Sequence, residues 1–290
     1  MNEEWDPSQS KTLNAGNSSS CFEILDNLPR HATFYPRRFM EQGAGKKYLD
    51  NLRSEEKLKE PPDSLVPRII QFVPLSGRHC MPIYYHVHKT GGTSLQQVQL
   101  KKWLNDVYYF RREMEMGSEN FLYRTKAIVK DSYESPALNP GFAFLRDPVL
   151  RFPSSVAQVL KGRPNTVDQC LESPDTHRLL YCILKLIERH GHFPETHLLP
   201  QAYELYGFVQ GYDAMIHVTD MSAISPILRD LGAPRFFGPR MTRVPHPRFP
   251  KFHDLVNVTI PDFLVQKICK IYQVDVLMIK ETKVTTTMCP

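Results

Sequence analysis

Short apolar runs alternate with longer segments of helical period from residue 66 onward. The predicted strands are 81–87, 141–145 and 214–218, and the predicted helices are 94–109, 149–161, 165–190, 222–231 and 261–272. Short buried strands that alternate with helices are typical of a parallel sheet. The pattern therefore predicts a single α/β domain in which helices cover both faces of a parallel sheet.

Residues 1–64 differ, because their polar and charged runs keep no sustained period of helix or strand. We interpret 1–64 as a flexible polar N-terminal extension with one short helix near 46–58. The α/β domain is predicted to span 65–283, and 284–290 to form a tail.

The composition is that of a globular protein, with 41% hydrophobic and 23% charged residues in a chain of 290. Lys and Arg number 36 against 31 Asp and Glu, and the net charge of +5 suits a phosphorylated or polyanionic ligand. No apolar run reaches the roughly 18 residues of a spanning helix, so we expect no membrane span in this chain. The stretch 235–251 has five Lys or Arg and no acid, and is either a solvated loop or a mobile cover. It lacks a motif and an aromatic platform for nucleic acid, so we expect no nucleic-acid partner.

The segment HVHKTGGTS, residues 86–94, follows the first predicted strand and begins a predicted helix. A glycine pair at this junction lets successive backbone N–H groups face a bound anion. Lys89 adds a charge, and Thr93 and Ser94 add hydroxyls. The segment is not a Walker A loop, because its lysine precedes the glycines. It predicts a phosphate or sulfate site, and the alternative is an ordinary glycine turn.

A second turn follows the next predicted strand, where Arg146-Asp-Pro is followed by Ser154 eight residues after the arginine. Ligands of open α/β sheets bind beyond the carboxyl ends of the strands. We therefore expect Arg146 and Lys89 to converge on one nucleotide with two anionic groups. The alternative for Arg146 is a salt bridge with Asp147 or a role in capping the helix.

Together the two turns resemble those of the sulfotransferases that use 3′-phosphoadenosine-5′-phosphosulfate (PAPS), particularly the Golgi carbohydrate group with the heparan sulfate 2-O-sulfotransferases. The resemblance spans about 83–279 and includes HLLPQ at 197–201 and YQVD at 272–275. It implies a P-loop-like fold, PAPS as the sulfuryl donor and a hydroxyl acceptor on a carbohydrate. It also implies two sets of ligands: Lys89, Thr90, Gly91, Gly92, Thr93 and Ser94 for the 5′-phosphosulfate, and Arg146 and Ser154 for the 3′-phosphate.

The chain departs from this family at three points. His88 stands where proline is usual, and Pro153 precedes Ser154 near the start of a helix, which predicts a displaced serine. The family location is the Golgi lumen, normally reached with a membrane anchor. The chain as written shows no anchor and would be cytoplasmic if it is complete.

Sulfuryl transfer requires a base for the acceptor proton and a positive charge for the departing phosphate. We predict that Lys89 supplies the positive charge and that His197 is the base. The alternative for His197 is a surface histidine with no role in the chemistry. His88 and His86 are the competing bases, although His86 is expected to be structural. A metal site at 190–197 is rejected, because no carboxylate or cysteine completes its histidines.

Six cysteines show no zinc-finger spacing. A pair between Cys170 and Cys182 would require a turn around 173–175 and an oxidising compartment. Two functions compete with the sulfotransferase. A kinase-like phosphotransferase should show Gly-Lys-Ser/Thr and magnesium carboxylates, whereas a catalytically silent nucleotide-binding scaffold would keep the anion site alone.

Overall fold

The computed structural model of the chain describes residues 25–26, 28, 30–54, 70–72, 83–90, 130, 133–134, 140–209, 211–220, 222, 249 and 255–290. The predicted helix 94–109 lies outside these residues, as does the predicted helix 222–231 apart from Ser222. Gly91, Gly92, Thr93 and Ser94 also lie outside them, as does the basic stretch 235–251 apart from Phe249.

The structure is a mixed α/β fold around an open sheet of order β1-β5-β4-β3-β2. The strands are β1 (Ala32–Phe34), β2 (Ile70–Phe72), β3 (Ile83–Tyr85), β4 (Gly141–Leu145) and β5 (Ile216–Asp220). The three strands predicted from sequence form the parallel centre β3-β4-β5. The short edge strands β1 and β2 pair antiparallel, so the prediction of a parallel sheet is correct only for the centre.

Two sets of helices accompany the sheet. The α-helices are α2 (Pro36–Glu41), α3 (Ala44–Ser54), α7 (Pro148–Gly162), α8 (Thr176–His190), α9 (Gln201–Val209), α11 (Asp262–Ile271) and α12 (Gln273–Thr282). The 3-10 helices are η4 (Pro164–Cys170), η5 (Thr196–Leu198) and η8 (Leu255–Asn257). The predicted helix 165–190 is thus divided into η4 and α8, because Asp175 caps a new helix with a hydrogen bond from Arg178 N–H.

One face of the sheet packs against α2, α3, α9 and α12. Alternate strand residues such as Tyr85, Ala143 and Val218 point to this face and bury against Leu205 and Met278. On the opposite face the rings of Tyr84, Phe142 and Phe144 are also buried and pack together, with centroids 5.2 to 5.9 Å apart. Among the described residues, the helical cover lies on the first face.

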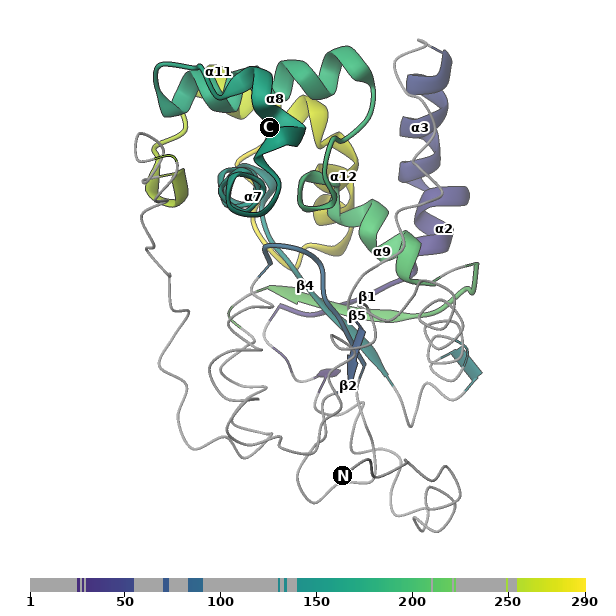
Figure 1. Cartoon of the computed structure of the whole chain (residues 1–290). Helices are drawn as coiled ribbons and strands as arrows, with labels where there is room; N and C mark the ends of the chain where they lie inside the picture. Colours follow the sequence, from purple (N-terminus) through teal and green to yellow (C-terminus); the bar gives the residue numbers. More distant parts are fainter. Residues whose placement is uncertain are drawn as a thin grey trace, which may run out of the picture.

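A second cluster of apolar residues holds α7, α8, α11 and α12 together with the 3-10 helices. Figure 1 shows these helices gathered beyond one end of the sheet, where β4 runs into α7. That end is the carboxyl end of the parallel strands. A disulfide between Cys170 and Cys182 ties η4 to α8, and the turn that such a pair requires lies between them. A second disulfide, Cys269–Cys289, ties α11 to the last residues.

The predicted boundaries at 65 and 284 need correction. Within the supposed extension, β1 pairs with β5, and Phe34, Phe39 and Leu49 are buried in the core. These elements are short and stand among polar residues, so their period is weak in the sequence. At the other end, Val284 is fully buried. None of the described helices combines the length and apolar character needed to span a bilayer.

Candidate functional site

The backbone turn after β3 is held from both sides. Lys89 has a φ of 63°, a left-handed conformation that is uncommon for a residue with a side chain. The N–H of His88 donates to Glu204 Oε2 at 2.9 Å, and its carbonyl accepts from Arg151 Nε at 2.8 Å. Thr90 is buried and its hydroxyl donates to the Val87 carbonyl at 2.8 Å. The hydroxyl of Thr90 therefore stabilises the turn instead of facing a ligand.

The amine of Lys89 is half-buried among cations. Its Nζ donates to Gln158 Oε1 on α7 at 3.3 Å. Burial, and then the charges of Lys161, Arg146 and Arg151, lower the pKa of Lys89 to about 8. Among the described residues no carboxylate forms an ion pair with this amine, so an incoming anion would relieve the repulsion.

Arg146, at the carboxyl end of β4, has a rigidly held backbone. Its N–H donates to Gln201 Oε1 at 2.9 Å, and its carbonyl accepts from Gln201 Nε2 at 2.7 Å. The guanidinium Nη1 lies 3.4 Å from the Lys89 carbonyl oxygen and 3.3 Å from Ser154 Oγ. Burial is the main reason that the pKa of Arg146 is lowered, followed by the charge of Arg151. The structure thus brings Lys89, Arg146 and Ser154 together, as predicted.

The alternative reading of Arg146, a salt bridge to Asp147, is not what the structure has. Asp147 caps α7 instead, because its Oδ1 accepts from Val149 N–H at 2.7 Å and from Leu150 N–H at 3.3 Å. Pro153 lies inside α7 without ending the helix. The displacement of Ser154 expected from Pro153 is therefore not observed, since Ser154 is still within reach of Arg146.

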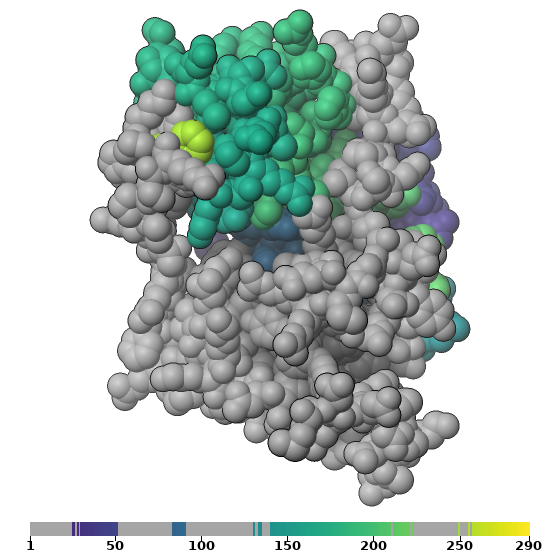
Figure 2. All heavy atoms as spheres, viewed as in Figure 1, coloured from purple at the N-terminus to yellow at the C-terminus, as the bar shows by residue number. Residues whose placement is uncertain are grey.

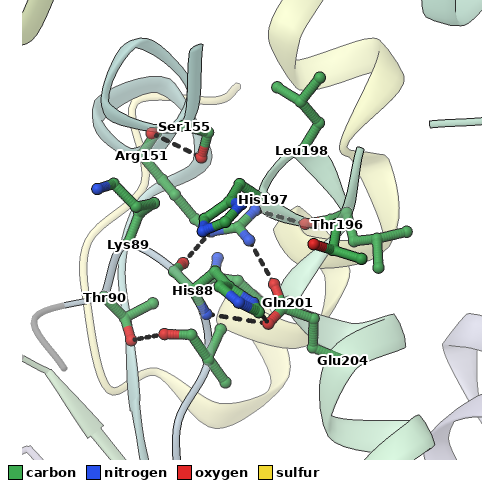
Figure 3. Close-up of polar contacts among 12 residues, drawn as sticks. His88, Lys89, Thr90, Arg151, Ser155, Thr196, His197, Leu198, Gln201 and Glu204 are labelled. Carbon is green, nitrogen blue, oxygen red and sulfur yellow. Dashed lines mark hydrogen bonds and ion pairs between the residues drawn. The ribbon is translucent and has the colours of Figure 1, made fainter. Parts of the chain in front are cut away.

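A buried ion network supports the turn from below. Arg151, only 1% exposed, donates to the Leu199 carbonyl at 2.6 Å and to Glu204 Oε1 at 2.5 Å. The second oxygen of Glu204 accepts from His88, whose Nδ1 lies 2.7 Å from it. Figure 3 shows Arg151, Glu204 and His88 linked in this way, with Lys89 turned toward α7. The network fixes three segments of chain around one carboxylate.

A second histidine–carboxylate pair lies beside the first. His197 Nδ1 is 2.8 Å from Glu195 Oε2, and its backbone N–H donates to the same oxygen at 2.5 Å. The His197 ring contacts the His88 ring edge-on, with centroids 4.4 Å apart. Burial is the largest influence and lowers the pKa of His197, although Glu195 opposes it. The hydrogen bonds and charge of His197 outweigh burial at Glu195 and lower its pKa to about 2. His197 is thus held within the site and is not a free surface histidine.

His86 is a poor candidate base. It is 7% exposed and stacks between Tyr84 and His88, with centroids 5.7 and 5.8 Å away. Burial lowers the pKa of His86 to about 3, so the ring stays neutral over the working range of an enzyme. This agrees with the expectation that His86 is structural.

Several residues hold the site although sequence reasoning did not assign them that role. Gln201 is itself held by Asp275, whose Oδ2 lies 3.3 Å from Gln201 Nε2 and whose Oδ1 accepts from Ala202 N–H at 3.0 Å. Tyr272 donates its hydroxyl to the Leu198 carbonyl at 2.6 Å. The signal that could have found them is the pair of segments 197–201 and 272–275, which the structure places in contact beneath Arg146.

Lys89 and Arg146 are partly exposed and lie at the carboxyl ends of β3 and β4. In Figure 2 the blue spheres of residues 83–90 reach the surface in a recess below the teal spheres that begin with α7. Within the part of the chain that the structure describes, no group of three or more His, Cys, Asp or Glu could hold a metal ion. Lys89 and Arg146 offer two cations to an anion, next to a histidine that a carboxylate holds.

Comparisons with protein-family models, with curated proteins and with solved structures found no match to this chain.

Proposed function

We propose that the protein is a sulfotransferase that moves a sulfuryl group from PAPS to a hydroxyl acceptor, most suitably a carbohydrate. The observation that carries the proposal is the convergence of Lys89 and Arg146 at the carboxyl ends of neighbouring parallel strands. Both cations lack an ion-pair partner among the described residues. PAPS carries two separate anionic groups, which two such cations would bind.

In this proposal each of the two turns binds one anionic group of the donor. Lys89 binds the 5′-phosphosulfate, with Gly91, Gly92, Thr93 and Ser94 as further ligands that the sequence resemblance implies. Arg146 binds the 3′-phosphate, and Ser154 supplies a hydroxyl beside it. Thr90 contributes through the turn that its hydroxyl stabilises. The resulting anion site is P-loop-like, because its ligands lie in the turn between a strand and a helix.

His197 is the proposed general base. The Glu195 carboxylate can only accept a hydrogen bond, so Nδ1 of a neutral His197 carries the hydrogen and Nε2 keeps its lone pair. As the acceptor oxygen bonds to sulfur, the bond from sulfur to the phosphate oxygen breaks and the acceptor proton moves to Nε2. The charge of Lys89 then stabilises the departing adenosine 3′,5′-bisphosphate.

The decisive experiment compares nucleotides by thermal shift and calorimetry. Adenosine 3′,5′-bisphosphate should stabilise the protein, by about 2.7 kcal/mol at a hundredfold excess over its dissociation constant. A preference for ATP with magnesium would contradict the proposal and favour a phosphotransferase. Binding of the bisphosphate without sulfation of any glycan acceptor from PAPS would instead favour a silent nucleotide-binding scaffold.

Arg146→Ala tests the second anion site. A charge-assisted hydrogen bond is worth roughly 1.5 to 3 kcal/mol, so the variant should lose most of its preference for the bisphosphate over adenosine 5′-monophosphate. Arg178→Ala is the matched control, because Arg178 is an exposed arginine on α8. If Arg146→Ala and Arg178→Ala retain the same preference, the 3′-phosphate binds elsewhere.

A further inference from the structure

The last residues of the chain contact the turn that carries Arg146. Met288 N–H donates to Asp147 Oδ2 at 2.6 Å, while Oδ1 of the same carboxylate caps α7. The two oxygens of Asp147 thus accept hydrogen bonds from different segments, Oδ1 from the start of α7 and Oδ2 from Met288. No part of the donor site described above explains this second contact.

The segment 284–290 is fastened on both sides of Met288. Val284 is fully buried against the sheet core. Cys289 is 5% exposed and forms the disulfide with Cys269 on α11. Met288 itself is 53% exposed, so its side chain does not hold it in place. The disulfide to the adjacent residue is the covalent restraint on the Met288 N–H.

Asp147 transmits this restraint to Arg146, because the two residues share a peptide bond. Gln201 holds the N–H and carbonyl of Arg146. Asp147, the next residue, is itself fixed by its contacts to α7 and to Met288. The guanidinium extends from this doubly held backbone to Ser154, and a fixed backbone limits the directions in which it can point.

We propose that segment 284–290 orders the anion site through Asp147, which acts as a positioning residue for Arg146, and that the Cys269–Cys289 disulfide makes that positioning sensitive to reduction. A dithiol reductant would supply two electrons and two protons, leaving two thiols on the protein and a disulfide on the reductant. The released segment no longer holds Met288 at Asp147, and Arg146 becomes less ordered. The identity of the anion rests on the proposed function, whereas the coupling between the chain end and the turn does not.

The first test separates the contact from the helix cap. Asp147→Asn keeps an amide oxygen that can cap α7, but turns an NH2 group toward the Met288 N–H. We expect faster hydrogen exchange in peptides that span 284–290 and 144–150. We also expect about tenfold weaker binding of adenosine 3′,5′-bisphosphate, with adenosine 5′-monophosphate affinity unchanged. That factor corresponds to about 1.4 kcal/mol, slightly less than the roughly 1.5 to 3 kcal/mol of a hydrogen bond to a charged group, because Arg146 is still present in the variant.

The second test changes the disulfide, with the other disulfide as its control. The double variant Cys269→Ser/Cys289→Ser should reproduce the exchange and affinity changes of Asp147→Asn. Cys170→Ser/Cys182→Ser removes a disulfide of η4 and α8 that does not contact the turn, and should leave bisphosphate affinity unchanged. Equal exchange at 144–150 in the parent, Asp147→Asn and the Cys269/Cys289 variant would overturn the proposal. If the parent binds no bisphosphate, the proposed function fails, and the exchange measurement still decides the coupling.

Discussion

The lowered pKa of Lys89 should make binding of the proposed donor depend on pH in a range where ordinary lysines do not titrate. An amine with a pKa of about 8 is about 90% charged at pH 7 and about 10% charged at pH 9. If the anion binds only the charged form, its dissociation constant should rise about tenfold between these pH values, or about 1.4 kcal/mol. A lysine at the usual value near 10.4 would change affinity by only a few per cent.

The assay is calorimetric titration with adenosine 3′,5′-bisphosphate from pH 7 to 9.5. The ligand is a suitable probe, because phosphate monoesters complete their last ionisation near pH 6 and its charge is then constant. Lys89→Arg is the matched control, since a guanidinium stays charged over the whole range. The parent should lose affinity with rising pH, and Lys89→Arg should not.

The stability of the unliganded protein should change in the opposite direction. Between about pH 8 and 10 the unfolded chain binds a proton at Lys89 that the folded chain has released, so this residue adds stability as the pH rises. Lys89→Met should lack that increment. An affinity that stays flat to pH 9 in the parent, or that falls equally in Lys89→Arg, would refute the account of a buried, uncompensated amine.

Four other predictions concern three groups around the turn and the disulfide between η4 and α8. His197→Ala should reduce turnover about 10² to 10⁴-fold with little change in donor affinity, and the acid limb of the parent rate should lie below pH 6.5 because burial lowers the pKa of His197. Glu195→Gln should move that limb to still lower pH, since Glu195 raises the pKa; unchanged pH–rate profiles would contradict both expectations. Glu204→Gln should destabilise the protein by roughly 3 to 5 kcal/mol in chemical denaturation, because it leaves a buried guanidinium uncompensated, and a loss below 1 kcal/mol would refute this. Cys182→Ser opens a loop with a sequence separation of 12 and should cost about 3 kcal/mol, which thermal unfolding under oxidising conditions would measure.

The sequence predicted those parts of the fold that depend on local pattern. The buried run 141–145 is β4 with the expected bounds, whereas the predicted helix 165–190 is divided into η4 and α8. The edge strand β1 was missed, because three residues among polar neighbours show no period until a partner strand covers them.

The convergence of the proposed anion-binding residues was predictable to the extent that these residues follow strand ends. Lys89, Arg146 and Ser154 come together because β3 and β4 are parallel neighbours. Arg151 and Glu204 were missed, since each looks like an ordinary surface charge in the sequence. They are buried only because they lie against each other and against backbone carbonyls that are distant in the chain.

The partners of Arg151 also bear on the order in which the chain can fold. Its three contacts, to the His88 carbonyl, the Leu199 carbonyl and Glu204, close loops of 63, 48 and 53 residues. Closing each loop costs chain entropy that the contact then offsets. The guanidinium therefore gains its partners only when most of the domain has already collapsed. A chain that emerges during synthesis therefore carries an exposed Arg151 until residue 204 is available. If the protein binds a nucleotide as proposed, that binding should appear in the same late kinetic phase of refolding as the burial of the core, with no earlier intermediate that binds the anion.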